Sequence, residues 1–178
     1  MRPSRLLAVV AGAIMAAQFV SIEPAHAAID DLACHYDHVS FNACLDFEDV
    51  GEAGKLNAHI GLDEFMSQAH ASDLIGDGTD FRASLWADDD RDQFIADLTL
   101  VPGWPTAEVG GLGAAFIGTG LSRAVLNEDA GDKDEIYAKI SYFDHHRGER
   151  VMRTTGVVRG EFTYLPPGGG HPVCLLFC

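Results

Sequence analysis

The sequence predicts a mainly β protein, an antiparallel β-sandwich of about eight strands with one short helix and disulfide staples. Three observations predict it: short segments whose apolar residues recur with a period of two, turn residues between these segments, and an even number of cysteines. Because successive side chains of a strand point to opposite faces, a period of two gives each strand one apolar face. Several such strands with regular turn signals are typical of sandwiches.

The first 27 residues are predicted to be a signal peptide that is cleaved near Ala27. Arg2 and Arg5 precede an apolar segment at 6–20, and the segment 25–27 reads Ala-His-Ala, the small-x-small pattern of a cleavage site. The apolar segment is short for a membrane anchor, so an uncleaved anchor is only the alternative. We therefore expect a secreted protein, extracellular or periplasmic.

Cleavage would leave residues 28–178, enough for one domain with a sizeable core. We assign residues 28–165 to a single β-sandwich domain and residues 166–178 to a Gly/Pro link with a cysteine-containing tail. The formal charge is −15, and it becomes −16 once Arg2, Arg5 and Glu23 leave with the signal peptide. Such an acidic surface argues against nucleic acid and membrane as partners and favours cations and basic proteins.

An even number of cysteines in an exported chain predicts two disulfide bonds, because the compartment is oxidising. The cysteines concerned are Cys34, Cys44, Cys174 and Cys178. The sequence leaves three pairings open: the bond between Cys34 and Cys44 staples a hairpin, whereas pairing across the two groups closes a longer loop. A zinc site that adds His35 and His38 is an alternative, although its spacing matches no zinc knuckle.

The first half of the domain follows from alternation and turn residues. We expect strands at 36–41 and 45–50, a turn at 51–55 and another strand at 56–62. Asp63 is predicted to cap a helix that runs through Ile75.

The segment 81–101 predicts a β-hairpin, and the rest of the chain is organised around it. Alternating apolar residues begin at Phe81 on the first arm and at Phe94 on the second, and Pro102 and Pro105 end the second arm. Trp104, at this corner, is a candidate partner anchor, and a plug beneath a loop is the alternative.

The second half predicts further strands at 114–119, 136–143, 150–158 and 161–165, while the segment 121–126 fits either a helical turn or a strand extension. The turn at 144–149 contains His145 and His146, which we interpret as exposed residues rather than as a ligand pair.

Acidic residues concentrate in two connections. The members are Asp88, Asp89, Asp90 and Asp92 in the hairpin turn, and Asp129, Asp132 and Asp134 before the strand at 136–143. If consecutive strands alternate in direction, both connections lie at one end, together with Asp49 and Glu52, and the histidine turn lies at the other end.

Converging carboxylates predict a calcium site, because calcium takes six to eight oxygen ligands from flexible loops. A solvated acidic surface is the alternative interpretation. An EF-hand is excluded, since Gln93 replaces the turn glycine and Thr99 replaces the bidentate glutamate.

Two short segments resemble catalytic or cofactor-binding motifs, but neither matches its motif in full. The segment 120–124, GLSRA, departs from the nucleophile elbow at its last position, and the glycines at 110, 111 and 113 lack the third glycine of a dinucleotide fingerprint.

We therefore predict a secreted non-enzymatic binding module, an adaptor or accessory subunit of an extracellular assembly. Its partner would be another secreted or surface protein. The candidate anchors are Trp104 and the tail residues Leu175, Leu176 and Phe177. The alternatives are a calcium-dependent carbohydrate or surface binder and a small secreted hydrolase.

Overall fold

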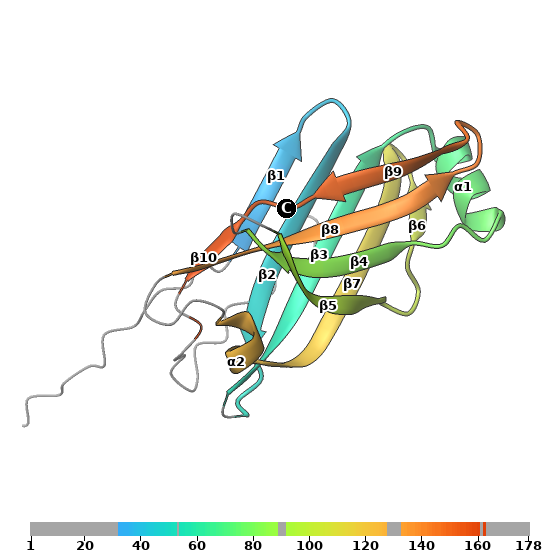
Figure 1. Ribbon diagram of the computed structural model, residues 1–178. Helices are drawn as coiled ribbons and strands as arrows, with labels where there is room; N and C mark the ends of the chain where they lie inside the picture. Colours follow the sequence, from blue (N-terminus) through green and yellow to red (C-terminus); the bar gives the residue numbers. More distant parts are fainter. Residues whose placement is uncertain (1–31, 53, 89–91, 128–132, 161, 163–178) are drawn as a thin grey trace, which may run out of the picture.

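The computed structural model describes residues 32–52, 54–88, 92–127, 133–160 and 162, which form one antiparallel sheet with two helices (Figure 1). The strands are β1 Leu32–Asp37, β2 Phe41–Asp49, β3 Lys55–Phe65, β4 Arg82–Ala87, β5 Gln93–Leu100, β6 Thr106–Glu108, β7 Gly111–Ser122, β8 Asp134–Asp144, β9 Glu149–Thr154 and β10 Val158–Gly160. The helices are α1 Gln68–Gly76 and α2 Arg123–Leu126. Neither helix is long and apolar enough to span a membrane, and no other helix occurs in the part of the chain that the structure describes.

The sheet curls until it is nearly closed and barrel-like. Its strand order is β1-β2-β3-β7-β5-β4-β8-β10, with β6 paired to β7 and β9 paired to β8. The two halves of the sheet join between β5 and β7 through two residue pairs, Thr99 with Ile117 and Leu100 with Phe116. In Figure 1, β4, β8 and β9 therefore cross over β2, β3 and β7.

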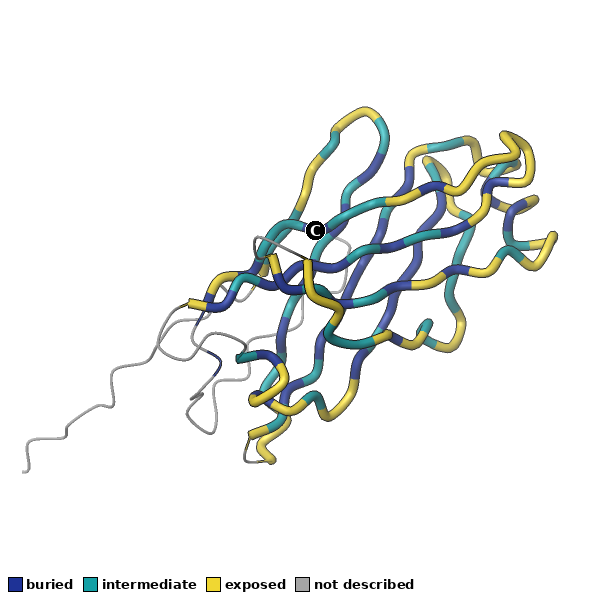
Figure 2. The backbone as a smooth tube through the Cα atoms, in the orientation of Figure 1, coloured by how far each residue is buried: buried dark blue, intermediate teal, exposed yellow. Residues whose placement is uncertain are grey.

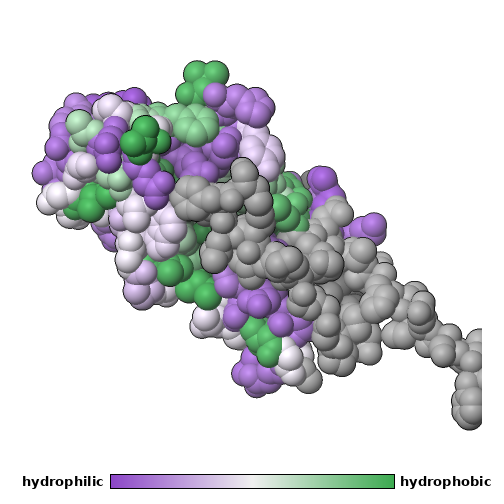
Figure 3. All heavy atoms as spheres, turned by 180° about the vertical axis from the view of Figure 1, so that it is seen from behind, coloured by the Kyte–Doolittle hydropathy of each residue, from purple (hydrophilic) through white to green (hydrophobic). Residues whose placement is uncertain are grey.

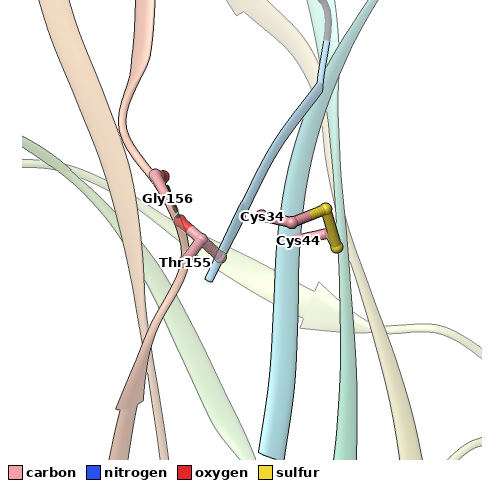
Figure 4. The surroundings of a disulfide bond; sticks show 4 residues. All are labelled: Cys34, Cys44, Thr155 and Gly156. Carbon is pink, nitrogen blue, oxygen red and sulfur yellow. Dashed lines mark hydrogen bonds between the residues drawn. A yellow bond between two sulfur atoms is a disulfide. The ribbon is translucent and has the colours of Figure 1, made fainter. Parts of the chain in front are cut away.

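The other seam of the sheet lies between β1 and the segment that links β9 to β10. Gly156 packs against the backbone of Cys34 there, and a Cβ atom built on Gly156 would lie 2.9 Å from both the backbone N and O of Cys34 (Figure 4). Only glycine allows so close an approach without a shift of one of the two segments.

The core lies inside this curved sheet. Alternate residues along β2, β3 and β8 are buried, as the dark blue segments of Figure 2 show, while the residues between them are half-buried or exposed, apart from the buried Gly61 and Tyr137. Leu45, Leu56, Ile136 and Ile140 are almost completely buried. Each such side chain contributes roughly 1.5–3 kcal/mol relative to an exposed one, so the period-two pattern fixes which face of each strand points inward.

Two predicted elements of the first half are wrong in their bounds. The strand expected at 36–41 is interrupted, because Asp37 accepts backbone hydrogen bonds from Val39 and Ser40 and makes a turn between β1 and β2. The helix expected to start after Asp63 starts at Gln68 instead, with Ser67 as its N-cap. Asp63 lies within β3, which continues to Phe65 because it pairs with β2 on one side and β7 on the other.

The central hairpin is confirmed, with Ala83 opposite Leu98 in the β4–β5 pair. Its register shifts between Leu85 and Trp86, where Leu85 faces Ala96 and Trp86 faces Phe94, so that Ile95 is an extra residue. Such a bulge re-aims the side chains beyond it. Phe94, predicted to face inward, is consequently 53% exposed and packs edge-on against Trp86.

The second half contains more elements than predicted. The segment 121–126 divides into the end of β7 and the short helix α2, and the single strand expected at 150–158 is two strands, β9 and β10. The described chain thus has ten strands and two helices rather than eight strands and one helix. Phe162 is buried against Phe47, and the remainder of the strand expected at 161–165 lies outside the described residues.

The disulfide prediction is confirmed for one pair. Cys34 and Cys44 are bonded across β1 and β2, whose register places the two residues opposite each other. This bond rules out pairing between the two cysteine groups, and it removes the free thiolates that a zinc site would need. Cys174 and Cys178 lie outside the described residues.

Candidate functional site

The outer face of β5, β4 and β8 carries a cluster of aromatic and charged side chains, of which the sequence patterns singled out only Asp92. In the β4–β8 register Trp86 lies opposite Tyr137, and in the β4–β5 register it lies opposite Phe94. Lys139 follows two residues after Tyr137, on the same face of β8, and Asp92 immediately precedes β5. We call these five residues the Trp86 cluster: Trp86, Asp92, Phe94, Tyr137 and Lys139.

Lys139 is the centre of the Trp86 cluster. Its ammonium Nζ lies 3.8 Å from the centroid of the Trp86 ring, 5.3 Å from that of Tyr137 and 2.6 Å from Asp92 Oδ2. A cation within about 6 Å of an aromatic ring face is attracted by the negative charge of that face. The ammonium therefore has two aromatic neighbours and one carboxylate.

The surroundings of Lys139 and Asp92 favour the charged forms of both side chains. Burial opposes the charge of Lys139, but hydrogen bonds with Asp92 and Tyr137 outweigh it and raise the pKa of Lys139. The hydrogen bond from Lys139, followed by the one from Tyr137, lowers the pKa of Asp92. Both groups are consequently charged at neutral pH.

The Trp86 ring is held independently of Lys139. Its indole Nε1 donates a hydrogen bond of 2.9 Å to Ser84 Oγ on the same strand, and the ring of Phe94 packs against it at 5.6 Å between centroids. The ring is thus fixed by its own strand and by the neighbouring strand β5.

Exposed apolar side chains extend this face beyond the Trp86 cluster. Met152 of β9 is 56% exposed, and Phe143 of β8 is 39% exposed. Met152 lies opposite Ser141, so it faces outward on the same side of the sheet as Lys139 and Phe143. Figure 3 shows the reverse side of the molecule, where apolar residues lie in separate groups among hydrophilic ones.

The strand directions bring the acidic connections to one end of the sheet. Neighbouring strands in the order β2-β3-β7-β5-β4 are all antiparallel, so strand direction alternates along this order. The first, third and fifth strands, β2, β7 and β4, therefore run in the same direction. The connections that follow these three strands therefore share one end. At this end the backbone N–H of Asp88 donates a 2.7 Å hydrogen bond to the carbonyl of Glu135.

Most carboxylates described at this end already have partners or are buried, whereas Asp88 is exposed. Asp92 pairs with Lys139, Asp49 accepts a 2.9 Å hydrogen bond from Arg123, and Asp134 is only 5% exposed. Within the described ranges no group of three or more His, Cys, Asp or Glu side chains has the arrangement of a metal site. Asp89, Asp90, Asp129 and Asp132, the other predicted calcium ligands, lie outside these ranges.

The histidine turn lies at the opposite end and contacts α1. The ring of His146 packs edge-on against His70 at 4.8 Å, and His70 Nε2 lies 3.3 Å from Asp144 Oδ1. Burial opposes the charge of Asp144, but the backbone N–H of Arg147, the His70 ring and the backbone N–H of His146 lower its pKa below the usual value. These contacts fasten α1 to the end of β8.

Of the residues predicted to anchor a partner, only Trp104 lies among the described residues. Trp104 is half-buried and packs over Gly113 of β7, where an added Cβ atom would lie 2.7 Å from the Trp104 ring. Such packing is what the alternative interpretation, a plug beneath a loop, predicts. Leu175, Leu176 and Phe177 lie outside the described residues.

Comparison of the whole chain with protein-family models, with curated proteins and with solved structures finds no match.

Proposed function

We propose that this chain is an exported β-sandwich module that binds a protein partner and does not catalyse a reaction. The proposed contact surface is the outer face of β5, β4, β8 and β9. The observation that carries the proposal is the exposed Phe94 beside the fixed ring of Trp86 on that face.

This surface has the composition of an interface centre. Aromatic side chains and methionine are enriched at the centres of protein–protein interfaces, and tryptophan and tyrosine supply much of the binding energy of measured interfaces. Phe94, Phe143 and Met152 provide exposed apolar area, and Trp86 provides a ring whose orientation is already set. Binding would therefore order few additional side chains, which lowers its entropic cost.

The charge of the chain indicates a basic partner. With a formal charge of −15 for the whole sequence, the protein repels acidic molecules and attracts basic ones during encounter. Acidic side chains such as Asp88 and Asp97 are exposed near the Trp86 cluster, where they would orient a basic surface. We infer that the partner is a secreted or surface protein with basic residues around an apolar centre.

The experiment is a pull-down from the culture supernatant of the producing organism. The tagged protein is compared with a Phe94→Ser variant and with a matched Phe65→Ser control, in which an exposed phenylalanine at the end of β3 is changed. We expect the wild type and the control to retain the same partner, and the Phe94→Ser variant to lose it. Retention by all three proteins would contradict the proposed surface.

Calcium binding at the acidic end is the second candidate. The shared direction of β2, β4 and β7 and the contact between Asp88 and Glu135 support it. We expect millimolar calcium to raise the thermal unfolding temperature if the acidic connections bind it. The same pull-down in chelator separates the candidates, because a calcium-dependent binder would lose its partner there and the proposed adaptor would keep it.

A further inference from the structure

The Trp86 cluster holds the positive charge of Lys139 between aromatic rings and a carboxylate. The ammonium of Lys139 lies 3.8 Å from the Trp86 ring and 2.6 Å from Asp92 Oδ2, with Tyr137 as a third neighbour. Two aromatic rings and a carboxylate around one ammonium group are the elements by which proteins recognise cationic ligands. In the free protein, the cation in this position belongs to the chain itself.

We propose that Trp86, Tyr137 and Asp92 form a cation-binding site that Lys139 occupies in the free protein, and that a lysine or arginine side chain of the partner displaces it on binding. This inference rests on the proposed function, and it specifies which part of the surface binds a basic side chain of the partner.

The site persists without Lys139. Trp86 is oriented by its hydrogen bond to Ser84 and by the ring of Phe94, and neither contact involves the ammonium. Tyr137 is only 8% exposed and lies directly opposite Trp86 in the β4–β8 register. Its position is therefore set by the sheet.

Lys139 is an occupant that can leave. Its side chain is 21% exposed and that of Asp92 is 46% exposed, so the pair is in contact with water. Ion pairs in contact with water hold their partners weakly, and the ammonium at the end of a flexible four-carbon chain regains its full hydration when it moves outward. A partner cation that arrives with an apolar interface around it can then take the same position.

The test removes Lys139 and measures the binding of a small cation. Lys139→Met is compared with Arg82→Met, which removes one positive charge from the same outer face of β4 without touching the Trp86 cluster. Both variants carry Trp104→Phe, so that Trp86 is the only tryptophan of the chain. The probe is tetramethylammonium chloride, titrated against sodium chloride at equal ionic strength, with Trp86 fluorescence as the readout.

We expect Lys139→Met to show a saturable fluorescence change and to bind the probe about tenfold more tightly than the chain that retains Lys139. Arg82→Met should behave like the chain that retains both residues. Adding Asp92→Asn to Lys139→Met should weaken the binding, because the carboxylate is lost. Circular dichroism confirms that each variant is folded, and Lys139→Gln replaces Lys139→Met if the latter is not.

The absence of a saturable change in the folded Lys139 variant would overturn the inference, and so would an equal change in Arg82→Met. These outcomes are independent of the pull-down. If Phe94→Ser keeps its partner while the titration saturates, the proposed partner surface fails and the cation site stands. If Phe94→Ser loses its partner while the titration shows nothing, the surface stands and the cation site fails.

Discussion

Arg153 of β9 forms a two-pronged ion pair with Glu64 of β3, although the two strands are not neighbours in the sheet. The guanidinium Nε donates to Glu64 Oε2 at 2.8 Å, and Nη2 donates to the other carboxylate oxygen. Glu64 is only 5% exposed, and the guanidinium also lies 4.7 Å from the Phe41 ring. The pair therefore ties the two sides of the curled sheet together.

Removal of Arg153 should destabilise the protein strongly, because it leaves the buried carboxylate of Glu64 without its partner. We expect Arg153→Met to lower the free energy of unfolding by about 3–5 kcal/mol. Urea denaturation at neutral pH measures this change.

Arg150→Met is the matched control for this prediction, since Arg150 is exposed on the same strand, and we expect it to cost less than about 0.5 kcal/mol. The double variant Glu64→Leu with Arg153→Met should recover most of the loss, because replacing both members of a buried pair removes the unpaired charge. Equal losses in Arg153→Met and Arg150→Met would contradict the structural role of the pair.

Asp144 should make folding stability depend on pH in acid. Its pKa is lower in the folded protein than in the unfolded chain, so the folded state favours the charged carboxylate. The resulting stabilisation is fully present above the unfolded value of about 3.9 and is lost as the pH falls through the lower folded value. Urea denaturation between about pH 7 and about pH 2 should show a smaller acid loss for Asp144→Asn than for the wild type. The control is Asp97→Asn, which removes an exposed carboxylate and should leave the dependence of unfolding free energy on pH nearly unchanged. The same pH dependence in all three proteins would refute the role of Asp144.

The disulfide between Cys34 and Cys44 should stabilise the protein by restricting the unfolded chain. The two residues are 10 positions apart, and closing a loop of this size contributes about 2–3 kcal/mol. We expect the Cys34→Ser/Cys44→Ser variant to unfold at correspondingly lower urea concentration. With dithiothreitol present, the wild type should unfold at the same urea concentration as this variant; a wild type that stays more stable under reduction would argue against the assigned contribution.

Ser67 should stabilise the start of α1, since its side chain accepts the backbone N–H of His70. Ser67→Ala is expected to cost about 1 kcal/mol in thermal or urea unfolding. Asp63→Asn is the control and should have little effect, because Asp63 lies in β3 and caps no helix. A larger loss from Asp63→Asn than from Ser67→Ala would instead favour the helix start that the sequence pattern predicts.

Local patterns predicted much of the secondary structure. The alternation from Ile136 to Tyr142 corresponds to β8, and the alternation from Leu56 to Leu62 corresponds to β3. These predictions succeed because the backbone of any β-strand points successive side chains to opposite faces, whichever strands become its neighbours. The cap at Asp63 failed for the opposite reason, because pairing with two neighbouring strands outweighs a local capping preference.

The candidate site could not be predicted in the same way. The pattern of the second arm of the hairpin places Phe94 on the inner face, and only the bulge at Ile95 moves it next to Trp86. Lys139 is 53 positions from Trp86 in sequence, and the two meet because β8 pairs with β4.

The sequence by itself determined the apolar face of most strands, the acidic charge and the acidic composition of the connection between β4 and β5, because these depend on side-chain order and composition. The tertiary structure decided which strands are neighbours, which cysteine bonds to Cys34 and which aromatic residues surround Lys139. The physical reason is that hydrogen bonds between strands join residues far apart in the chain, and no local pattern encodes the partner. The connection between β4 and β5 shows the difference: its acidic residues follow from the sequence, whereas the ion pair of Asp92 with Lys139 exists only because β4 lies between β5 and β8.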